Sequence, residues 1–418
     1  MSFQQTRLFF NAMKAVKQMV AEVRKNKDKA VRKYTAVFDK IKLNNFRVSK
    51  QEIKLAYQKV DKKTITTLRK ATKNIKTFAQ KQLAYFKDFE YTKNGVTVGQ
   101  KIIPIERIGV YVPGGRYPLP STALMCIIPA KVAGVREIIV CSPKIKPVTI
   151  VAADLAGADL IFNIGGVQAI AAMAYGTETI PKVDKIVGPG NIYVTQAKKE
   201  VFGDCGIDLL AGPSEILIVA DKWARPEFIA ADLLAQAEHD TAAKVILVSD
   251  SKDLIEKVDK ELKTQLAKIS TKEVIKESLK KKKEILVKNL KEAIKVANEI
   301  APEHLSLQVK NLYPVRNQRF SNGAKKYLNQ LKNYGSLFLG GTSAVAFGDY
   351  CSGPNHVLPT NKASKFTGGL SVKDFVKIQT YQIISKKGAK KLSKIAKDFA
   401  SIEGLDAHKK SVEIRESR

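Results

Sequence analysis

The pattern of apolar and polar positions divides the chain into regions of different character. In residues 1 to about 95, apolar residues recur at helical spacing among many lysines, and the first glycine is Gly95. An apolar stripe with this period predicts amphipathic helices. From Lys101 onward, short apolar runs that end in Gly or Pro alternate with longer stretches of helical character.

Two series of such runs follow one another along the chain. The first contains IGVYVPGG, REIIVCSP, DLIFNIGG and DKIVGPG, and the second extends from SEILIVAD to GSLFLGG. Regular succession of strand, turn and helix predicts a parallel, doubly wound sheet with helices on both faces. The predicted fold class is therefore α/β, with two Rossmann-like doubly wound domains and small helical extensions at the N- and C-termini.

Two further segments have their own patterns. The tail from Asp374 is predicted to be helical and basic, with Gly404 capping one helix before a last extended piece. Residues 313–323, YPVRNQRFSNG, show neither the helical nor the strand period of apolar residues, which predicts a surface loop.

Composition narrows the class of protein. Of 418 residues, 44% are hydrophobic, with 25 Gly and 15 Pro, which excludes a collagenous, disordered or disulfide-scaffold chain. The four cysteines, Cys126, Cys141, Cys205 and Cys351, form no CxxC pair, so neither a disulfide framework nor a thiolate zinc site is indicated. A cytoplasmic location is expected, because neither a leader peptide nor an apolar run of about 18 residues is present.

The charge is strongly positive, with 72 Lys+Arg against 40 Asp+Glu and a net charge of +32. Clustered lysines would indicate nucleic-acid binding, but here they are spread over many helix-like stretches. Since motifs of RNA recognition and zinc-finger spacing are also absent, a solvated basic surface is favoured over a nucleic-acid partner.

Glycines mark three turns between a predicted strand and a predicted helix. The chain has no GxGxxG fingerprint, but VPGG lies at 112–115, IGG at 164–166 and GPGN at 188–191. At such turns bare backbone can approach a ligand and the helix N-terminus favours an anion. Turn geometry alone also recruits glycine, so both interpretations stay open.

Each of the four histidines lies near a polar residue in the sequence. Gln236 and His239 are three apart, which places them on one face of a predicted helix and suits two ligands of one metal. The other pairs are Glu303 with His304, Asp349 with His356, and Glu403 with His408. Taken singly, each histidine is more simply explained by a structural role, but the four together favour a site, because the chain uses histidine nowhere else.

Cys351, two residues from Asp349, offers a different chemistry. A thiolate there would attack an aldehyde and form a thiohemiacetal for oxidation. No adjacent base or cation in the sequence marks its pKa as lowered, so a bystander thiol is favoured.

Longer motifs identify a family. In order, GVYVPGG, IGGVQAIAAMAYGTETIPKVDKIVGPGN, LLAGPSEILIVAD, LLAQAEHD, APEHLSL, GDYCSGPNHVLPT and EGLDAH closely resemble the histidinol dehydrogenase family, over roughly residues 1–415. The resemblance implies an NAD-dependent alcohol and aldehyde dehydrogenase. Its members oxidise L-histidinol to L-histidine through L-histidinaldehyde, a four-electron reaction that forms the last two steps of histidine biosynthesis.

The resemblance also implies residue roles. Glu303 and His304 are the catalytic residues, with His304 as the base for both oxidations and Glu303 activating water. One zinc ion per subunit, which orients the substrate, is expected on Gln236, His239, Asp349 and His408. NAD is expected at Tyr111, Gln168 and Asn191. The substrate is expected to contact Ser214, Gln236, His239, His304, Asp349, His356, Glu403 and His408.

Assembly and domain boundaries follow from the same resemblance. A homodimer is implied in which the C-terminal segment of one subunit, with Glu403 and His408, completes the site of the other. The implied division is an N-terminal helical extension at 1–13, a first α/β domain from 14–109 and 214–370, an inserted Rossmann-like domain at 110–213, and a dimerisation segment at 371–418. Residues 313–326 form an insertion of about a dozen residues, which a surface loop tolerates at small cost.

Two other functions remain as alternatives. One is a dehydrogenase that acts on a different amino alcohol, and the other is a binding or regulatory protein that keeps the fold without catalysis. The presence of Glu303, His304 and all four ligand positions argues against the second alternative.

Overall fold

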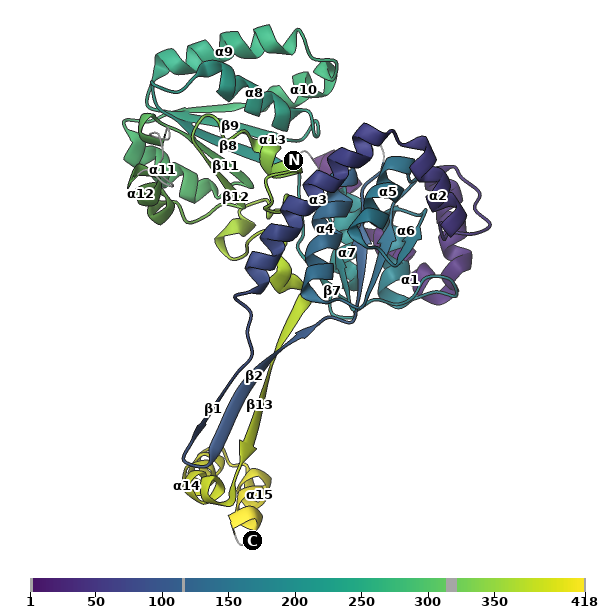
Figure 1. Ribbon diagram of the computed structural model, residues 1–418, viewed down its shortest axis with the longest axis vertical. Coiled ribbons are helices and arrows are strands. Elements are labelled where there is room, and N and C mark those ends of the chain that lie inside the picture. Colours follow the sequence, from purple (N-terminus) through teal and green to yellow (C-terminus); the bar gives the residue numbers. More distant parts are fainter. Residues whose placement is uncertain (1–2, 115–116, 313–321, 417–418) are drawn as a thin grey trace.

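The computed structural model describes residues 3–114, 117–312 and 322–416. Two α/β lobes lie side by side, and a long arm projects from them to the C-terminal helices (Figure 1). Among the described residues, no helix is both long and apolar enough to cross a membrane.

The first lobe is built on a five-stranded parallel sheet. Its strand order is β5 (Leu160–Phe162), β4 (Glu137–Cys141), β3 (Arg107–Tyr111), β6 (Lys185–Val187), β7 (Gly206–Ile207). The connecting helices are α4 (Pro120–Ala133), α5 (Pro147–Ala156), α6 (Gly166–Tyr175) and α7 (Ile192–Val201). The reversal of strand order between β3 and β6 confirms the predicted doubly wound topology.

The second lobe repeats this topology. Its parallel order is β10 (Lys283–Leu286), β9 (Lys244–Ser249), β8 (Glu215–Ala220), β11 (His304–Gln308), β12 (Ser336–Leu339). Its helices are α8 (Pro226–Ala237), α9 (Lys252–Leu266), α10 (Lys272–Leu279), α11 (Leu290–Ile300), α12 (Asn322–Gln330) and α13 (Val345–Tyr350). Short 3₁₀ turns lie at Lys310–Leu312, Ala363–Lys365 and Val372–Phe375.

The loop predicted at 313–323 is only partly described. Residues 313–321 lie outside the described residues, whereas α12 begins at Asn322, so the predicted loop extends too far at its end.

The N-terminal helices cover the first sheet. α1 (Phe3–Tyr34) contacts α6 and α7, α2 (Lys50–Lys59) contacts α5, and α3 (Lys62–Leu83) contacts α4. A π-helical turn, Thr35–Asp39, follows α1. These contacts differ from the grouping of 14–109 with 214–370 that the resemblance implied, because the apolar stripes of the helices are buried against the first lobe. The division into domains stays a prediction.

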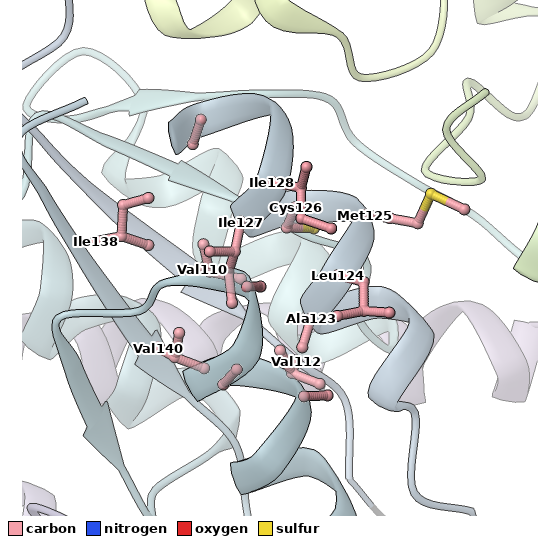
Figure 2. Packing of buried hydrophobic residues seen from close by; sticks show 14 of the residues in the cluster. Val110, Val112, Ala123, Leu124, Met125, Cys126, Ile127, Ile128, Ile138 and Val140 are labelled. Atoms are coloured by element: carbon pink, nitrogen blue, oxygen red, sulfur yellow. The ribbon is translucent and has the colours of Figure 1, made fainter. Parts of the chain in front are cut away.

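Buried side chains on α4 show how the first lobe is held together. Ile127 and Ala123 pack against Val110 and Val140 of the sheet (Figure 2). α4 is buried along nearly its whole length, because α3 covers the face that points away from the sheet. The result is a rigid platform beneath the ends of β3 and β4.

The arm is a three-stranded antiparallel sheet that the sequence analysis missed. β1 (Phe89–Lys93) and β13 (Val376–Ile384) both pair with β2 (Val96–Pro104), where helix was expected up to residue 95 and again from Asp374. The strands are rich in Val, Ile, Thr and Tyr, but they lie largely in solvent, so no core face imposes a clear period of two.

Two helices end the arm. α14 (Lys386–Ile402) and α15 (Asp406–Glu416) pack against one another, so the extended last piece predicted after Gly404 is wrong. Gly404 itself has φ +70°, the left-handed conformation expected of a residue that separates two helices.

Candidate active site

A cavity of about 730 Å³ lies at the carboxyl edge of the first sheet. Tyr111, at the end of β3, lines it together with Gln168 of α6 and Asn191, the residue before α7. The three positions expected to bind NAD are thus brought together by the strand-to-helix turns. Lys144 and Lys146 also line this cavity, together with Asp39, and give its lining a positive balance of charge.

The polar groups in this cavity are partly unsatisfied. The Tyr111 hydroxyl accepts a hydrogen bond from the Gly166 N–H at 3.1 Å, and burial raises the pKa of Tyr111 to about 12. The Asn191 side chain caps α7 by accepting from the N–H groups of Tyr193 and Val194. The buried Gln168 Nε2 has no partner within the described parts of the chain, so a donor remains for a ligand.

One turn in the cavity wall requires glycine, because neighbouring backbone lies very close to it. Gly188 has φ +112°, and a Cβ there would lie 2.1 Å from the Tyr111 carbonyl oxygen. The Gly188 N–H donates to Asp208 Oδ2 at 2.7 Å, while Lys198 Nζ donates to the Gly188 carbonyl at 3.0 Å. Lys198 and Asp208 also form a buried ion pair.

Lys198→Met should therefore lower the thermal unfolding midpoint of the protein. It leaves Asp208 as an unpaired buried charge, a defect that typically costs about 3–5 kcal/mol. Differential scanning calorimetry measures the effect, with the exposed neighbour Lys199→Met as the matched control. Equal midpoints for the two variants would show that the buried pair does not stabilise the turn.

The pair Glu303 and His304 lies at the start of β11, at the amino edge of the second sheet. Both side chains are buried, at 7% and 4% exposed. Glu303 Oε2 accepts from the Glu215 N–H at 2.8 Å, and His304 Nδ1 lies 3.2 Å from the Glu215 carbonyl oxygen. The Glu215 backbone thus fixes both side chains.

Asp349 completes this group from α13. Its Oδ1 lies 3.3 Å from His304 Nε2, and Glu303 Oε2 lies 3.7 Å from Nδ1 of the same ring. Burial disfavours the imidazolium of His304, but the carboxylates of Glu303 and Asp349 outweigh it and raise the pKa of His304 to about 9. Burial acts in the opposite direction on Glu303: it disfavours the charged carboxylate and is the main reason why the pKa of Glu303 rises to about 7.

His356 connects this group to the first lobe. Its Nδ1 lies 2.8 Å from the Asp349 carbonyl oxygen and its Nε2 lies 3.4 Å from Thr122 Oγ1 on α4. Asn355 Nδ2 also donates to the Met125 carbonyl of α4 at 2.6 Å. The group around His304 is therefore docked against the platform that supports the first cavity.

The C-terminal end of α8 reaches the same neighbourhood. Gln236 is buried, and its Oε1 has no hydrogen-bond partner among the described residues. His239 is exposed just after the helix ends at Ala237, and it lines a second cavity of about 680 Å³ with Tyr350. Burial raises the pKa of Asp349, but the imidazoles of His304, His356 and His239 reverse this and hold it below its ordinary value.

The remaining predicted site residues lie in two places. Ser214 directly precedes β8 beside Glu215, at the same edge of the sheet as His304. Glu403 and His408 are exposed on the arm, far from the other site residues of the same chain (Figure 1). Within the described ranges, no three His, Cys, Asp or Glu side chains gather in a way that holds a metal.

The cysteines do not join this arrangement. Cys351 is exposed at the end of α13, whereas Cys126, Cys141 and Cys205 are buried free thiols. Burial raises the pKa of Cys205 to about 12 and also raises the pKa values of the Cys126 and Cys141 thiols.

If the Cys351 thiol is a bystander, Cys351→Ala is expected to stay within about twofold of the parent activity, because replacing an exposed side chain without a role in the chemistry changes little. Initial rates of NADH formation measure this. A folded, zinc-loaded variant without activity would instead support the thiohemiacetal chemistry.

Sequence analysis missed one important residue of this site. Glu215 acts through its backbone, and its side chain is held by Lys244 Nζ at 2.6 Å. A backbone contact leaves no signature in residue type, although the place of Glu215 at the start of a central strand marks it as a neighbour of His304.

The fold and the site together define an α/β protein of the dinucleotide-binding type, with a cavity at the carboxyl edge of one sheet and a buried histidine and carboxylate pair at the amino edge of the other. Sequence comparison gives the family: the chain matches the histidinol dehydrogenase family over residues 4–416 and belongs to it.

Individual relatives agree with this assignment. The histidinol dehydrogenase of Clostridium acetobutylicum is 46% identical over 410 residues, covering 96% of this chain and 92% of that protein. That of Methanocaldococcus jannaschii is 43% identical over 412 residues, covering 97% and 93%. The crystal structure of histidinol dehydrogenase from Elizabethkingia anophelis superposes with a TM-score of 0.89 at 38% identity, covering 96% and 91%.

Proposed function

We propose that this protein catalyses the NAD-dependent, four-electron oxidation of L-histidinol to L-histidine through L-histidinaldehyde, the last two steps of histidine biosynthesis. The observation that carries the proposal is the buried group of Glu303, His304 and Asp349 at the junction of the lobes. Such a group supplies an imidazole as one base and a carboxylate as a second.

In the first oxidation, His304 in its neutral form is the base that accepts the proton of the alcohol hydroxyl; with a pKa of about 9, a larger fraction of His304 is neutral at mildly alkaline than at neutral pH. When bound, NAD would supply the hydride acceptor for both oxidations, one molecule for each, and His304 would release its proton to solvent between the two steps. Glu303 then removes a proton from a water molecule that attacks the aldehyde, and His304 accepts the hydroxyl proton of the hydrate in the second oxidation. The backbone of Glu215 holds both side chains in place for these proton transfers.

The residues present fit a zinc ion. Gln236 has a buried oxygen without a partner among the described residues, and His239 and Asp349 add a nitrogen and a carboxylate from the same neighbourhood. A mixed nitrogen and oxygen set suits zinc. When bound, zinc would orient the substrate through its amine and imidazole nitrogens.

The fourth proposed ligand, His408, comes from a second copy of the chain. On α14 the apolar side chains Leu392, Ile395, Phe399 and Ile402 follow helical spacing and are all exposed, Ile402 at 80%. A stripe of this kind needs a partner surface. We therefore propose a homodimer in which the arm of each subunit brings Glu403 and His408 to the site of the other.

Substrate contacts are proposed for the residues around this centre. They are Ser214, Gln236, His239, His304, Asp349, His356, and, from the partner arm, Glu403 and His408. NAD is proposed to occupy the first cavity beside Tyr111, Gln168 and Asn191. The free Gln168 amide and the lysines that line the cavity support an anionic, hydrogen-bonding ligand there.

Reaction stoichiometry tests the proposed function. The zinc-loaded protein is incubated with L-histidinol and excess NAD, and NADH and histidine are quantified. Two NADH per histidinol, with histidine as product, are expected. Turnover of another amino alcohol but not of histidinol, or no turnover with zinc bound, would refute the proposal.

A further inference from the structure

Asp232 is a buried carboxylate that the proposed chemistry does not use. It lies on α8 one helical turn before Gln236 and is 6% exposed. Gln308 Nε2 donates to Asp232 Oδ2 at 3.3 Å and also contacts Ser306 Oγ at 3.3 Å. The Asp232 carboxylate also lies close to the backbone N–H of Val345, the first residue of α13.

This contact with Val345 lies at the start of a helix that has no cap of its own. α13 contains only six residues, and its N-cap, Ala344, supplies no side-chain hydrogen bond. The first N–H groups of a helix lack partners within the helix, and so short a helix is marginal without tertiary support. Asp232 therefore supplies from α8 the acceptor that the chain of α13 does not provide.

The position of this cap fixes the position of Asp349. Val345 begins α13 beside Asp232, and Asp349 lies one turn later at 3.3 Å from His304 Nε2. His304 and Gln308 point to the same face of β11, at its two ends. α13 thus runs back along β11, held by Asp232 at one end and presenting Asp349 to His304 at the other.

We propose that Asp232 is a positioning residue for the metal site, which fixes α8, α13 and β11 relative to one another and so places Gln236, Asp349 and His304. It contacts neither the substrate nor the metal. The inference rests on the proposed function, because that function assigns the zinc ligands. Residues that orient metal ligands typically change metal affinity by 10–100-fold when they are removed.

The competing explanation is that Asp232 only stabilises the second lobe. Removing it takes away the carboxylate that lies close to the Val345 N–H and one of the two hydrogen-bond partners of the buried Gln308 amide, and such a loss costs stability wherever it occurs. Ser278→Ala is the matched control: Ser278 is fully buried on α10 of the same lobe, and its Oγ donates to the Ala243 carbonyl at 3.2 Å, away from α13 and β11.

The first measurement is zinc affinity of the full-length protein, by competition with a chromophoric chelator. Asp232→Ala should weaken zinc binding by about 10–100-fold, and Ser278→Ala should leave it unchanged. Asp232→Asn should restore most of the affinity. Its amide oxygen can accept from Val345, and a rotated Gln308 amide can accept from the new NH₂ through the Oε1 atom that now has no partner in the described chain.

The second measurement needs no metal. Amide hydrogen exchange of zinc-free protein should be faster at residues 345–350 in Asp232→Ala, and unchanged there in Ser278→Ala. If Asp232→Ala does not fold, Val345→Pro removes the N–H that lies close to Asp232 and so tests the same contact from the other side. Proline is tolerated at the first helical position, and Ala344 already has the extended backbone (φ −57°, ψ 139°) that must precede it.

These outcomes separate the inference from the proposed function. Wild-type protein that binds no zinc would refute the assigned ligands, and exchange at 345–350 would still decide the role of Asp232. Unchanged exchange at 345–350 in both Asp232→Ala and Val345→Pro would overturn the inference. So would a zinc affinity that falls equally in Asp232→Ala and Ser278→Ala.

Discussion

Replacement of His304 by asparagine should slow both oxidations, by about 10²–10⁴-fold each, the usual contribution of a general base. Asparagine keeps a polar side chain of similar size, and its amide can still contact the Glu215 carbonyl, but it accepts no proton at neutral pH. The folded site should survive, because Glu303 keeps its hydrogen bond from the Glu215 N–H.

Glu303→Gln gives the contrasting result. The alcohol step should change little, since His304 remains, whereas oxidation of added histidinaldehyde should fall by about 10²-fold or more because no carboxylate activates water. Rapid mixing with histidinol and, separately, with histidinaldehyde resolves the two steps through NADH absorbance. Equal losses in both steps for Glu303→Gln would contradict this division of roles.

The first lobe could be predicted well from the sequence because its chemistry follows its topology. Tyr111, Gln168 and Asn191 each stand at the end of a parallel strand or at the helix that follows, and such ends meet at one edge of the sheet. Glycine-rich turns mark these ends in the sequence, but whether the turns bind a ligand stayed open there, and the three residues were named only through the family resemblance.

The second lobe departs from that rule, and topology alone does not find its site. Glu303 and His304 lie at the amino edge of the sheet, where the strands begin and where α8 and α13 end. The long motifs identified these residues only through the family resemblance. Glu215 was not predicted as a site residue, because its backbone, not its side chain, holds Glu303 and His304.

The arm could not be predicted because its pairing partners are distant in the sequence. Gly99 of β2, for example, pairs with Tyr381 of β13. Solvent also surrounds much of this sheet, so the local sequence pattern carries little information about it. The same sheet carries His408 away from His239 of its own chain (Figure 1). A zinc site that draws on both residues therefore requires two copies of the chain.

A mixture of two inactive variants should recover activity if the arm serves the partner subunit. In a dimer of one His304→Asn chain and one His408→Ala chain, the site of the second chain keeps its own His304 and receives an intact His408 from the first. The other site of that dimer carries both defects. Random pairing makes about half of the dimers mixed, each with one of two sites intact, so about a quarter of wild-type activity is expected.

Co-expression of the two variants with different affinity tags allows the mixed dimer to be isolated and its rate measured. Each variant expressed alone is the control. Both should be nearly inactive, because His304→Asn lacks the base and His408→Ala lacks a zinc ligand. The double variant His304→Asn/His408→Ala paired with wild type gives a second check, because each of its sites then carries a single defect and activity should be absent. If His408 instead acted within its own chain, the His304→Asn and His408→Ala dimer would stay inactive, and the dimer of the double variant with wild type would retain one working site. The two dimers therefore give opposite results depending on whether His408 serves its own chain or the partner.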